Sequence, residues 1–322
     1  MKTISILIPT YNEQENVVPI AYAVIDQFDK SLSEYNYEII FIDNNSKDNT
    51  RMLITELCAS NSNIKAIFNN KNYGQFNSPF YGLLQTTGDC SILLCADFQD
   101  PVEMLPCFIR EWENGYKIVC GIKTSSQENK FIYFVRTIYY KCIHKLSDIE
   151  QIEHFTGFGL YDKSFLDTLR YLNDPEPFLR GIVAELGPER KDLPYEQKER
   201  RSGKTSNNWY SLYDAAMLSV TSYTKISLRL ATFIGIILSL LSFFVGFIYL
   251  LLKIIFWERF LAGMAPLLIG VFFLGAMQLF FIGLLGEYIM VINKRLMNRP
   301  LVIEDTRINF QISANNYTNP AA

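Results

Sequence analysis

The sequence predicts an α/β domain with a mostly parallel sheet, followed by a pair of helices that span a membrane. Over residues 1–121, short apolar runs alternate with segments of helical spacing, and two long apolar stretches lie near the end of the chain. Strands that are apolar along their whole length are typical of parallel sheets covered on both faces. The alternation therefore favours parallel strands joined by helices.

The expected elements follow one another closely in the first part of the chain. Strands are expected over residues 4–8, 37–43, 64–68, 91–96 and 117–120, and helices over residues 12–29, 50–60 and 78–86. In parallel sheets, ligands bind beyond the carboxyl ends of the strands. Asp43 and Asp97 each stand at such an end and are placed to share one cleft.

The composition excludes several classes of protein. The net charge of −3 provides no basic field of the kind that nucleic-acid-binding proteins carry. All six cysteines lie within residues 1–142 without a CxxC pair, and only two histidines, His144 and His154, accompany them, so no structural zinc site is expected. Reduced, mostly buried thiols fit a reducing compartment, and we expect both histidines to be packing or surface residues.

Residues 131–146 are rich in aromatic side chains with basic residues between them. This pattern suits a helix that lies in the membrane interface, and an ordinary packing helix is the alternative. We expect a further helix over residues 209–227, immediately before the first long apolar stretch.

The two apolar stretches cover residues 228–256 and 264–292. Each exceeds the roughly 20 residues that cross the hydrocarbon core, and their short connector predicts a transmembrane hairpin. Lys225 and Arg229 flank the start of the hairpin and Lys294, Arg295 and Arg299 follow it, which places both termini in the cytoplasm. The N-terminus lacks the pattern of a signal peptide and agrees with this orientation.

These features divide the chain into four parts. They are a cytoplasmic domain over residues 1–208, the juxtamembrane helix, the spans within 228–292 and a cytoplasmic tail over 293–322. We expect the polar tail after about Asp305 to be disordered.

The segment around Asp97 has the chemistry of a cation site. Asp97 and Gln99 offer oxygen ligands after a strand, and Mg²⁺ or Mn²⁺ takes one or two protein carboxylates together with diphosphate oxygens. A single aspartate after a strand equally fits a plain turn or a helix cap.

Several motifs together resemble one family. They are PTYNE at 9–13, IDNNSKDNT at 42–50, NYGQ at 72–75, TGD at 87–89 and ADFQDP at 96–101, followed by RSGKTSNNWYSLYDAA at 201–216 as a region, the two apolar stretches and GLLGEY at 283–288. Their order and spacing resemble the family 2 glycosyltransferases of the GT-A, Rossmann-like fold. Within that family they look like the bacterial polyprenyl-phosphate (bactoprenol) glucosyltransferases related to dolichol-phosphate mannose synthase.

The resemblance implies roles for individual residues. Pro9, Tyr11, Glu13 and Asp43 match positions that contact the nucleotide, and Asp43 matches the acid that hydrogen-bonds the base. Asp97 and Gln99 match positions that bind the metal and the diphosphate.

Basic residues match positions at both phosphates of the reaction. Lys123 and, less closely, Arg136 match positions near the acceptor phosphate, and Arg201, Ser202 and Lys204 match the loop that closes over the donor diphosphate. Asp97, Arg201 and Lys204 are the expected catalytic residues. A solvated charge run or a contact with anionic lipid is the alternative reading of the loop.

The sequence departs from the family pattern at two positions. Cys95 replaces the first acid of the usual DxD metal motif, and a thiol is a poor ligand for a hard cation. Gly157 stands where many relatives carry an acid, and Asp162 retains the last acid of the same pattern. A phosphate monoester with a second pKa of about 6 is already mostly dianionic near neutral pH, so loss of a protein base need not mean loss of activity.

The expected function is the inverting transfer of a hexose from a UDP-sugar, with glucose as the expected hexose, to undecaprenyl or a related polyprenyl phosphate. The enzyme would lie in the bacterial inner membrane as a two-span protein, and relatives suggest a homotetramer. A GDP-mannose-dependent enzyme and a catalytically inactive membrane scaffold are the alternatives. A processive synthase fits less well because the sequence has no QxxRW-type motif, and a two-span transporter fits less well because the spans carry almost no polar residues.

Overall fold

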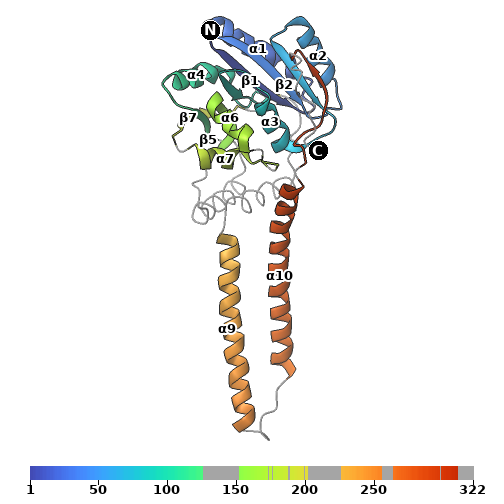
Figure 1. Cartoon of the computed structure of the whole chain (residues 1–322), viewed down its shortest axis with the longest axis vertical. Helices are drawn as coiled ribbons and strands as arrows, with labels where there is room; N and C mark the ends of the chain where they lie inside the picture. Colours follow the sequence, from blue (N-terminus) through green and yellow to red (C-terminus); the bar gives the residue numbers. More distant parts are fainter. Residues whose placement is uncertain are drawn as a thin grey trace, which may run out of the picture. The chain divides into compact units, whose positions relative to one another are not determined.

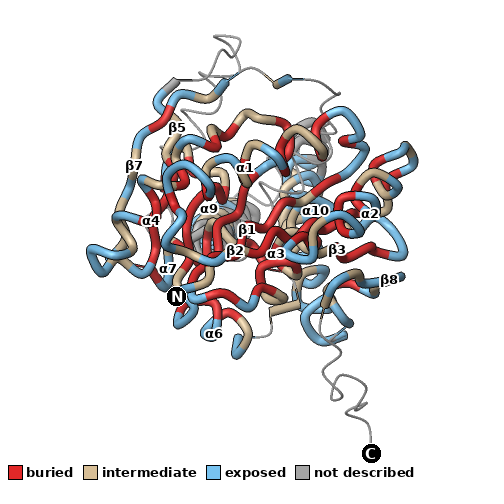
Figure 2. Tube along the Cα trace, turned by 90° about the horizontal axis from the view of Figure 1, so that it is seen from above, coloured by how far each residue is buried: buried red, intermediate tan, exposed pale blue. Residues whose placement is uncertain are grey.

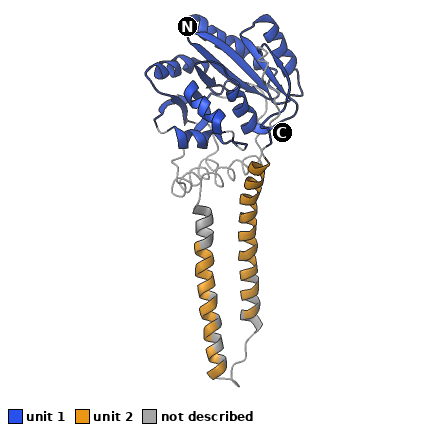
Figure 3. Cartoon of the chain, viewed as in Figure 1, with its two compact units in different colours: residues 1–134, 151–207, 298–322 blue, residues 135–150, 208–297 orange. Residues whose placement is uncertain are grey.

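The computed structural model describes residues 1–125, 152–172, 174–175, 177–187, 189–198, 200–201, 226–255, 264–297 and 299–310. The chain forms two compact units (Figure 3). The first contains Met1–Phe134, Gln151–Asn207 and Asn298–Ala322, and the second contains Val135–Glu150 and Asn208–Met297. The chain therefore passes from the first unit to the second and back twice.

An eight-stranded sheet organises the first unit, in the order β7-β5-β6-β4-β1-β2-β3-β8. The strands are β1 (Thr3–Thr10), β2 (Asn36–Asp43), β3 (Ile64–Asn69), β4 (Cys90–Leu93), β5 (Ile118–Ser125), β6 (Phe155–Asp162), β7 (Lys191–Glu196) and β8 (Glu304–Ile308). β1 pairs in parallel with β2 and β4, and β2 with β3, whereas β6 and β8 run antiparallel to their neighbours. The expected α/β architecture with a mostly parallel sheet is confirmed (Figure 1).

Helices cover both faces of the central strands. They are α1 (Val17–Ser31), α2 (Thr50–Ser60), α3 (Gly74–Leu84), α4 (Leu105–Glu113) after the short 3₁₀ turn η1 (Val102–Met104), α6 (Lys163–Leu172) and α7 (Leu179–Leu186). The fully buried side chains of Ile4, Ile6 and Ile8 join one core cluster with apolar residues of α1 and α2. On the other face Leu7 lies so close to Gly82 of α3 that a Cβ there would come within 2.7 Å of its methyl group. Figure 2 shows the resulting buried path through β1 and β2.

Two element boundaries differ from the sequence prediction. α1 begins at Val17 rather than near Asn12, because Asn12 adopts a positive φ of 56° and the Glu13 carbonyl accepts the amides of Asn16 and Val17 in a turn. β4 ends at Leu93, before the expected end at residue 96, so Asp97 lies in the loop beyond the strand.

The prediction of a disordered tail after Asp305 is wrong for the residues that the structure describes. Glu304–Ile308 forms β8, which pairs antiparallel with β3 in the register Phe68↔Thr306 and Ile67↔Arg307. Most of its side chains are at least partly exposed, as expected of an edge strand, so its sequence carries no apolar signal. Its pairing satisfies backbone groups at the open edge of β3, and this gain does not depend on side-chain polarity.

The second unit contains α9 (Ile226–Ile255) and α10 (Met264–Leu296). Among its described residues, one segment, Phe273–Leu296, is long and apolar enough to cross a membrane, with 24 residues and a mean hydropathy of 1.7. α9 includes a shorter apolar segment, Phe233–Val245. The structure thus supports membrane association through the C-terminal helix, and the second span stays a prediction.

The expected interfacial helix over 131–146 and the juxtamembrane helix over 209–227 lie outside the described residues, except for the first two residues of α9.

Candidate donor and phosphate site

Three neighbouring parallel strands end at the same edge of the sheet. β1 is paired with β2 through Thr10↔Asp43 and with β4 through Leu7↔Leu93. The loops that follow these strands carry Tyr11 to Glu13, Asp43 to Ser46, and Asp97. In the sheet order, β1 alone separates the strands that precede Asp43 and Asp97. That the two carboxylates share one cleft stays a prediction.

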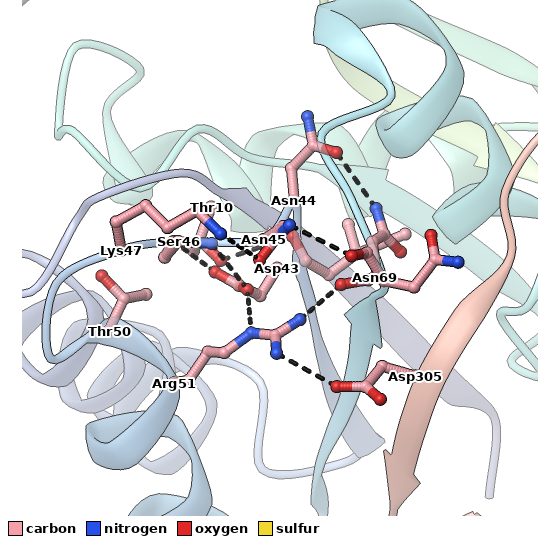
Figure 4. A network of polar contacts seen from close by, with 12 residues as sticks. Thr10, Asp43, Asn44, Asn45, Ser46, Lys47, Thr50, Arg51, Asn69 and Asp305 are labelled. Carbon is pink, nitrogen blue, oxygen red and sulfur yellow. Dashed lines mark hydrogen bonds and ion pairs between the residues drawn. The ribbon is translucent and has the colours of Figure 1, made fainter.

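Asp43 is buried at the end of β2 and organises the turn that follows. Its carboxylate accepts the Ser46 amide at 3.1 Å, the Ser46 hydroxyl, and Nε of Arg51 at 2.8 Å, while its side chain has no exposed surface. In the described structure its oxygens are already occupied by Ser46 and Arg51 (Figure 4). Asp43 therefore shapes the turn from within, and the surface of that turn is formed by its neighbours.

The β1 loop is tied to the same turn. The Asn12 amide donates to Oγ of Ser46 at 2.8 Å, and Oδ1 of Asn12 accepts the Lys47 amide at 2.7 Å. The Glu13 amide donates to Oγ1 of Thr50 at 2.9 Å. These contacts explain the positive φ of Asn12, a conformation that asparagine tolerates better than most residues.

Asn44 connects the turn to the start of α3. Its Oδ1 accepts the Tyr73 amide at 2.8 Å, and its Nδ2 donates to Oδ1 of Asn72 at 2.9 Å and to the Gly74 carbonyl at 3.1 Å. The segments IDNNSKDNT and NYGQ, which are separated in the sequence, therefore form one continuous polar loop cluster.

Arg200 lies between two carboxylates from different loops. Its Nη2 donates to Oε1 of Glu13 at 2.5 Å, and its Nε lies 3.5 Å from Oδ2 of Asp97. Glu13 is 8% exposed and Asp97 9% exposed, so both charges are largely removed from water. Burial raises the pKa of Glu13, and hydrogen bonds from Asn16 and the charge of Arg200 oppose that rise. Nε of Arg200 is buried without a hydrogen-bond partner, so its contact with Asp97 in the described structure is an ion pair and not a hydrogen bond.

The backbone around Asp97 is held by the segment that ends at Arg201. The Arg201 amide donates to the Asp97 carbonyl at 3.2 Å, and the Lys198 amide donates to the Gln99 carbonyl at 3.3 Å. Phe98 adopts a φ of 60°, which is strained for an aromatic residue, and the Arg201 guanidinium lies 5.2 Å from the centre of its ring. Strain of this kind concentrates at functional sites.

In the described structure the arginine that pairs with Glu13 and Asp97 is Arg200, and Arg201 is its neighbour in the sequence. The sequence assigned a phosphate contact to Arg201, whose guanidinium lies over the Phe98 ring in this structure, and no site role to Arg200. The role of Arg201 stays a prediction. The two residues are adjacent cations, and the motif alone gave no signal as to which side chain faces the carboxylates. Ser202, Lys204 and Arg136 lie outside the described residues.

A second buried carboxylate, Asp100, lies three residues beyond Asp97. It is 2% exposed and accepts the Tyr195 hydroxyl at 2.6 Å. Burial raises the pKa of Asp100, and the Tyr195 hydrogen bond and the Lys123 ammonium oppose the rise. Lys123 stands opposite Tyr195 in the parallel pair of β5 and β7. The predicted acceptor lysine therefore lies in the electrostatic reach of the same loop that carries Asp97.

The acid pattern around β6 has a structural explanation. Gly157 has a φ of 105°, a conformation that residues with side chains rarely adopt, and its carbonyl accepts the Tyr161 hydroxyl at 2.7 Å. Asp162 caps α6: its Oδ1 accepts the Ser164 amide at 2.9 Å, and its Oδ2 accepts Nε1 of Trp112 at 2.8 Å.

The residues near Asp97 fit a cation that takes most of its ligands from a diphosphate. Among the described residues no group of three or more His, Cys, Asp or Glu side chains could hold a metal. Among the described residues, Oδ1 of Asp97 accepts the Gln99 amide at 3.1 Å, and a carboxylate oxygen with one such partner can also bind a cation. Mg²⁺ binds in this way, through one or two carboxylates and substrate phosphates, without an all-protein cage.

Sequence comparison with known proteins agrees with the family that the motifs resemble. A family model described as "Glycosyl transferase family 2" matches residues 5–169. The chain is 30% identical over 287 residues to the "Prophage bactoprenol glucosyl transferase homolog" of Escherichia coli (strain K12), covering 89% of this chain and 93% of that protein. It is also 30% identical to the "Bactoprenol glucosyl transferase" of Shigella phage SfX, covering 94% of this chain and 99% of that protein. Among solved structures, mannosyl-3-phosphoglycerate synthase from Rubrobacter xylanophilus is similar with a TM-score of 0.48 and 15% identity, over 71% of this chain and 74% of that chain.

Proposed function

The chain belongs to glycosyl transferase family 2, and we propose that it transfers a hexose from a UDP-sugar to a polyprenyl phosphate at the cytoplasmic face of the membrane. The proposal names glucose as the hexose and undecaprenyl phosphate, the bactoprenol carrier, as the acceptor. Relatives named bactoprenol glucosyl transferases support it, because the similarity extends through the C-terminal apolar helices as well as the sheet domain.

The contact of Arg200 with Glu13 and Asp97 carries the proposal on the structural side. A guanidinium held between two largely buried carboxylates, with one donor unsatisfied, is prepared for a planar, multiply charged anion such as a diphosphate. A bound diphosphate would offer the Arg200 guanidinium hydrogen-bond acceptors in addition to the two carboxylates.

The neighbouring loops are proposed to bind different parts of the sugar-nucleotide donor. Hydrogen bonds join the turn from Asp43 to Thr50 to the loop after β1. Pro9 lies near the end of that strand and Tyr11 in the loop, and this cluster suits recognition of the nucleoside. Asp97 and Gln99 would hold Mg²⁺ or Mn²⁺, which when bound would neutralise charge on the departing nucleoside diphosphate. Arg200, with Arg201, Ser202 and Lys204 of the same loop, would stabilise the same charge directly.

The acceptor needs positioning more than deprotonation. Its phosphate is already mostly dianionic near neutral pH, and Lys123 and Arg136 are the residues proposed to bind it. Direct attack of a phosphate oxygen on the anomeric carbon forms the new C–O bond as the bond to the nucleoside diphosphate breaks, which inverts the configuration. Gly157 is compatible with this route, because the route uses no carboxylate base.

The membrane arrangement completes the proposal. α9 contains 30 residues and α10 contains 33, so each is longer than the about 20 residues needed to cross the hydrocarbon core. Phe233 is 69% exposed and Phe280 is 65% exposed within the second unit, as expected of side chains that face lipid. We propose a two-span protein of the inner membrane with both termini cytoplasmic, assembled as a homotetramer.

A transfer assay tests the function. Membranes that contain the protein are incubated with undecaprenyl phosphate, Mg²⁺ or Mn²⁺, and one of UDP-glucose, UDP-galactose, UDP-N-acetylglucosamine or GDP-mannose, and the lipid product is identified by mass spectrometry. Glucosyl-phospho-undecaprenol formed from UDP-glucose supports the proposal. A mannosyl product from GDP-mannose supports the alternative donor, and no lipid-linked sugar from any donor supports the inactive scaffold.

Asp97→Asn and Asp89→Asn form a matched pair for this assay. Asp97 follows β4 at the site, whereas Asp89 precedes β4 at the opposite edge and accepts the Thr3 amide at 2.8 Å. We expect Asp97→Asn to abolish product and Asp89→Asn to retain it. Full activity of Asp97→Asn would remove Asp97 from the proposed metal and diphosphate site.

A further inference from the structure

A single guanidinium, that of Arg51, joins the ends of three strands. Its Nε donates to Oδ2 of Asp43 at 2.8 Å, its Nη2 donates to the Asn69 carbonyl, and its Nη1 donates to Oδ2 of Asp305 at 3.2 Å. Figure 4 shows Arg51 with Asp43 on one side and Asp305 on the other. These partners come from β2, β3 and β8, the last of which is reached only after the two long apolar helices.

The strand that contributes Asp305 is fixed at both of its ends. Before β8, the Ile303 carbonyl accepts the Asn70 amide at 3.1 Å, and Val302 is 5% exposed. After β8, Nδ2 of Asn309 donates to the carbonyls of Cys58 at 2.7 Å and Ile64 at 2.8 Å. The position of Asp305 is therefore set by backbone pairing and end contacts that do not involve Arg51.

Asp43 depends on Arg51 for charge compensation. Its side chain has no exposed surface, and Arg51 is the cation with which the described structure pairs it. The side chain of Arg51 is 29% exposed, so solvent competes for its guanidinium unless further acceptors hold it. Asp305, with a side chain that is 53% exposed, supplies one such acceptor from the solvent side.

We propose that Asp305 is a positioning residue for the donor nucleotide, because it holds Arg51 against Asp43 and so fixes the turn from Asp43 to Thr50. This rests on the proposed function, in which that turn recognises the nucleoside. The C-terminal strand, outside the segment from residue 5 to 169 that defines the family match, thereby becomes part of the donor site's support.

Asp305→Asn tests the inference in the full-length protein, purified in detergent. The dissociation constant of UDP is measured by titration calorimetry, and the kinetic constants for UDP-glucose are measured with saturating undecaprenyl phosphate. We expect weaker UDP binding and a higher KM by about twofold to fivefold, the range for losing a partly exposed ion pair, with little change in kcat. Glu304→Gln is the matched control, because Glu304 lies on the same strand but pairs with Arg307 and Tyr81.

The salt dependence of UDP binding separates positioning from a general loss of stability. NaCl screens the exposed Arg51–Asp305 pair in the unaltered protein, so its affinity for UDP should fall more steeply with salt than that of Asp305→Asn. Asp305→Glu, which keeps the charge, should restore part of the affinity.

Each outcome decides a different claim. If the unaltered protein binds UDP and Asp305→Asn binds it equally, with the same salt dependence, the inference is overturned and the proposed function stands. If Glu304→Gln weakens UDP binding as much as Asp305→Asn, β8 acts only through general stability and the inference is again overturned. If the unaltered protein binds neither UDP nor GDP, the proposed function fails and the inference fails with it.

Discussion

At the residue scale, Arg200 shows how two loops become one site. Glu13 follows β1 and Asp97 follows β4, and each carboxylate is largely buried. Two such charges side by side would repel one another unless a cation lay between them. Arg200 supplies that cation and, through its planar guanidinium, a geometry that lysine does not reproduce.

We predict that Arg200→Lys and Arg200→Gln each lower kcat/KM for the UDP-sugar by about 100-fold or more, the usual cost of removing one donor that stabilises developing charge. Arg201→Gln should cost less, because the Arg201 guanidinium stacks on Phe98 instead of contacting Asp97. Initial rates of lipid-linked product measure all three variants. A larger loss for Arg201→Gln than for Arg200→Gln would return the phosphate contact to the residue that the sequence suggested.

Gly157 stands where the family resemblance leads one to expect an acid. A Cβ added there would lie 3.4 Å from a Leu93 methyl carbon and 3.8 Å from one of Leu179, so space is available. The obstacle is the φ of 105°, which glycine adopts without strain. An acid therefore cannot be inserted without a backbone change.

We predict that Gly157→Ala lowers the free energy of unfolding by about 1–3 kcal/mol and that Gly157→Asp does not raise the rate of transfer. Urea denaturation followed by tryptophan fluorescence gives the first quantity, and the transfer assay gives the second. A stable and faster Gly157→Asp enzyme would show that a base is useful here and would contradict the base-free route.

Asp162 is the remaining acid of that pattern, and its chemistry is structural. Burial raises its pKa, but hydrogen bonds from Ser164, Trp112 and Lys117 outweigh that effect and lower the pKa to about 2. A carboxyl whose pKa is lower in the folded state stabilises the fold above its unfolded value of 3.8, and that contribution is lost as the pH falls through about 2.

We predict that Asp162→Asn destabilises the protein at pH 7 by about 1 kcal/mol or more, as expected for a helix cap with additional partners. The difference from the unaltered protein should shrink between pH 4 and pH 2. Thermal unfolding at several pH values measures it. A difference that stays constant down to pH 3 and below would show that the charge of Asp162 is unimportant for the cap.

At the scale of elements, the sequence allowed the central strands and their helices to be predicted because burial dictates their composition. β2 carries the apolar run YEIIFID, and α2 was predicted with the bounds that the structure has, Thr50–Ser60. β8 has the sequence EDTRI, and its stability comes from pairing with β3. Such pairing depends on where the chain returns, which no local pattern encodes.

The same reasoning explains why only some residues of the candidate site could be predicted from the sequence. Asp43 and Asp97 were placed at one sheet edge because parallel strands end together, and Glu13 was assigned to the site from the family resemblance. The choice between Arg200 and Arg201, and the role of Arg51, depends on side-chain directions in loops. Neither periodicity nor motif spacing determines those directions.

We predict that deleting residues 301–322 lowers the melting temperature of the protein by about 5 °C or more, because β3 then presents an unpaired edge and the Tyr81, Arg307 and Asn309 contacts are lost. Deletion of residues 311–322 is the matched control, because it keeps the whole of β8. Differential scanning fluorimetry in detergent measures both. Equal melting temperatures for the two deletions would show that β8 does not stabilise the sheet.

At the scale of the whole molecule, the chain combines two kinds of solvent environment. The first unit buries an apolar core within its sheet and helices, whereas the second exposes large apolar side chains along α9 and α10. Exposure of this extent is costly in water and is expected where lipid is the solvent. The basic residues Lys294 and Arg295 in the last turn of α10 predict that this end of the helix faces the cytoplasm.

The orientation can be tested with fusions that report the side of the membrane. Alkaline phosphatase is active only outside the cytoplasm, and green fluorescent protein exported in unfolded form does not become fluorescent there. We predict that phosphatase fused after Gly263, between α9 and α10, is active, and that phosphatase fused after Ala322 is inactive, with the opposite pattern for the fluorescent protein. This follows because Lys225 and Arg229 precede the apolar part of α9 and Lys294, Arg295 and Arg299 follow that of α10, so the positive charges hold both ends of the hairpin on the cytoplasmic side. Active phosphatase at both positions would mean that α10 alone does not return the chain to the cytoplasm. A C-terminus outside the cytoplasm would also put β8 on the other side of the membrane from β3. The pairing of Phe68 with Thr306 therefore requires both strands to lie on the same side.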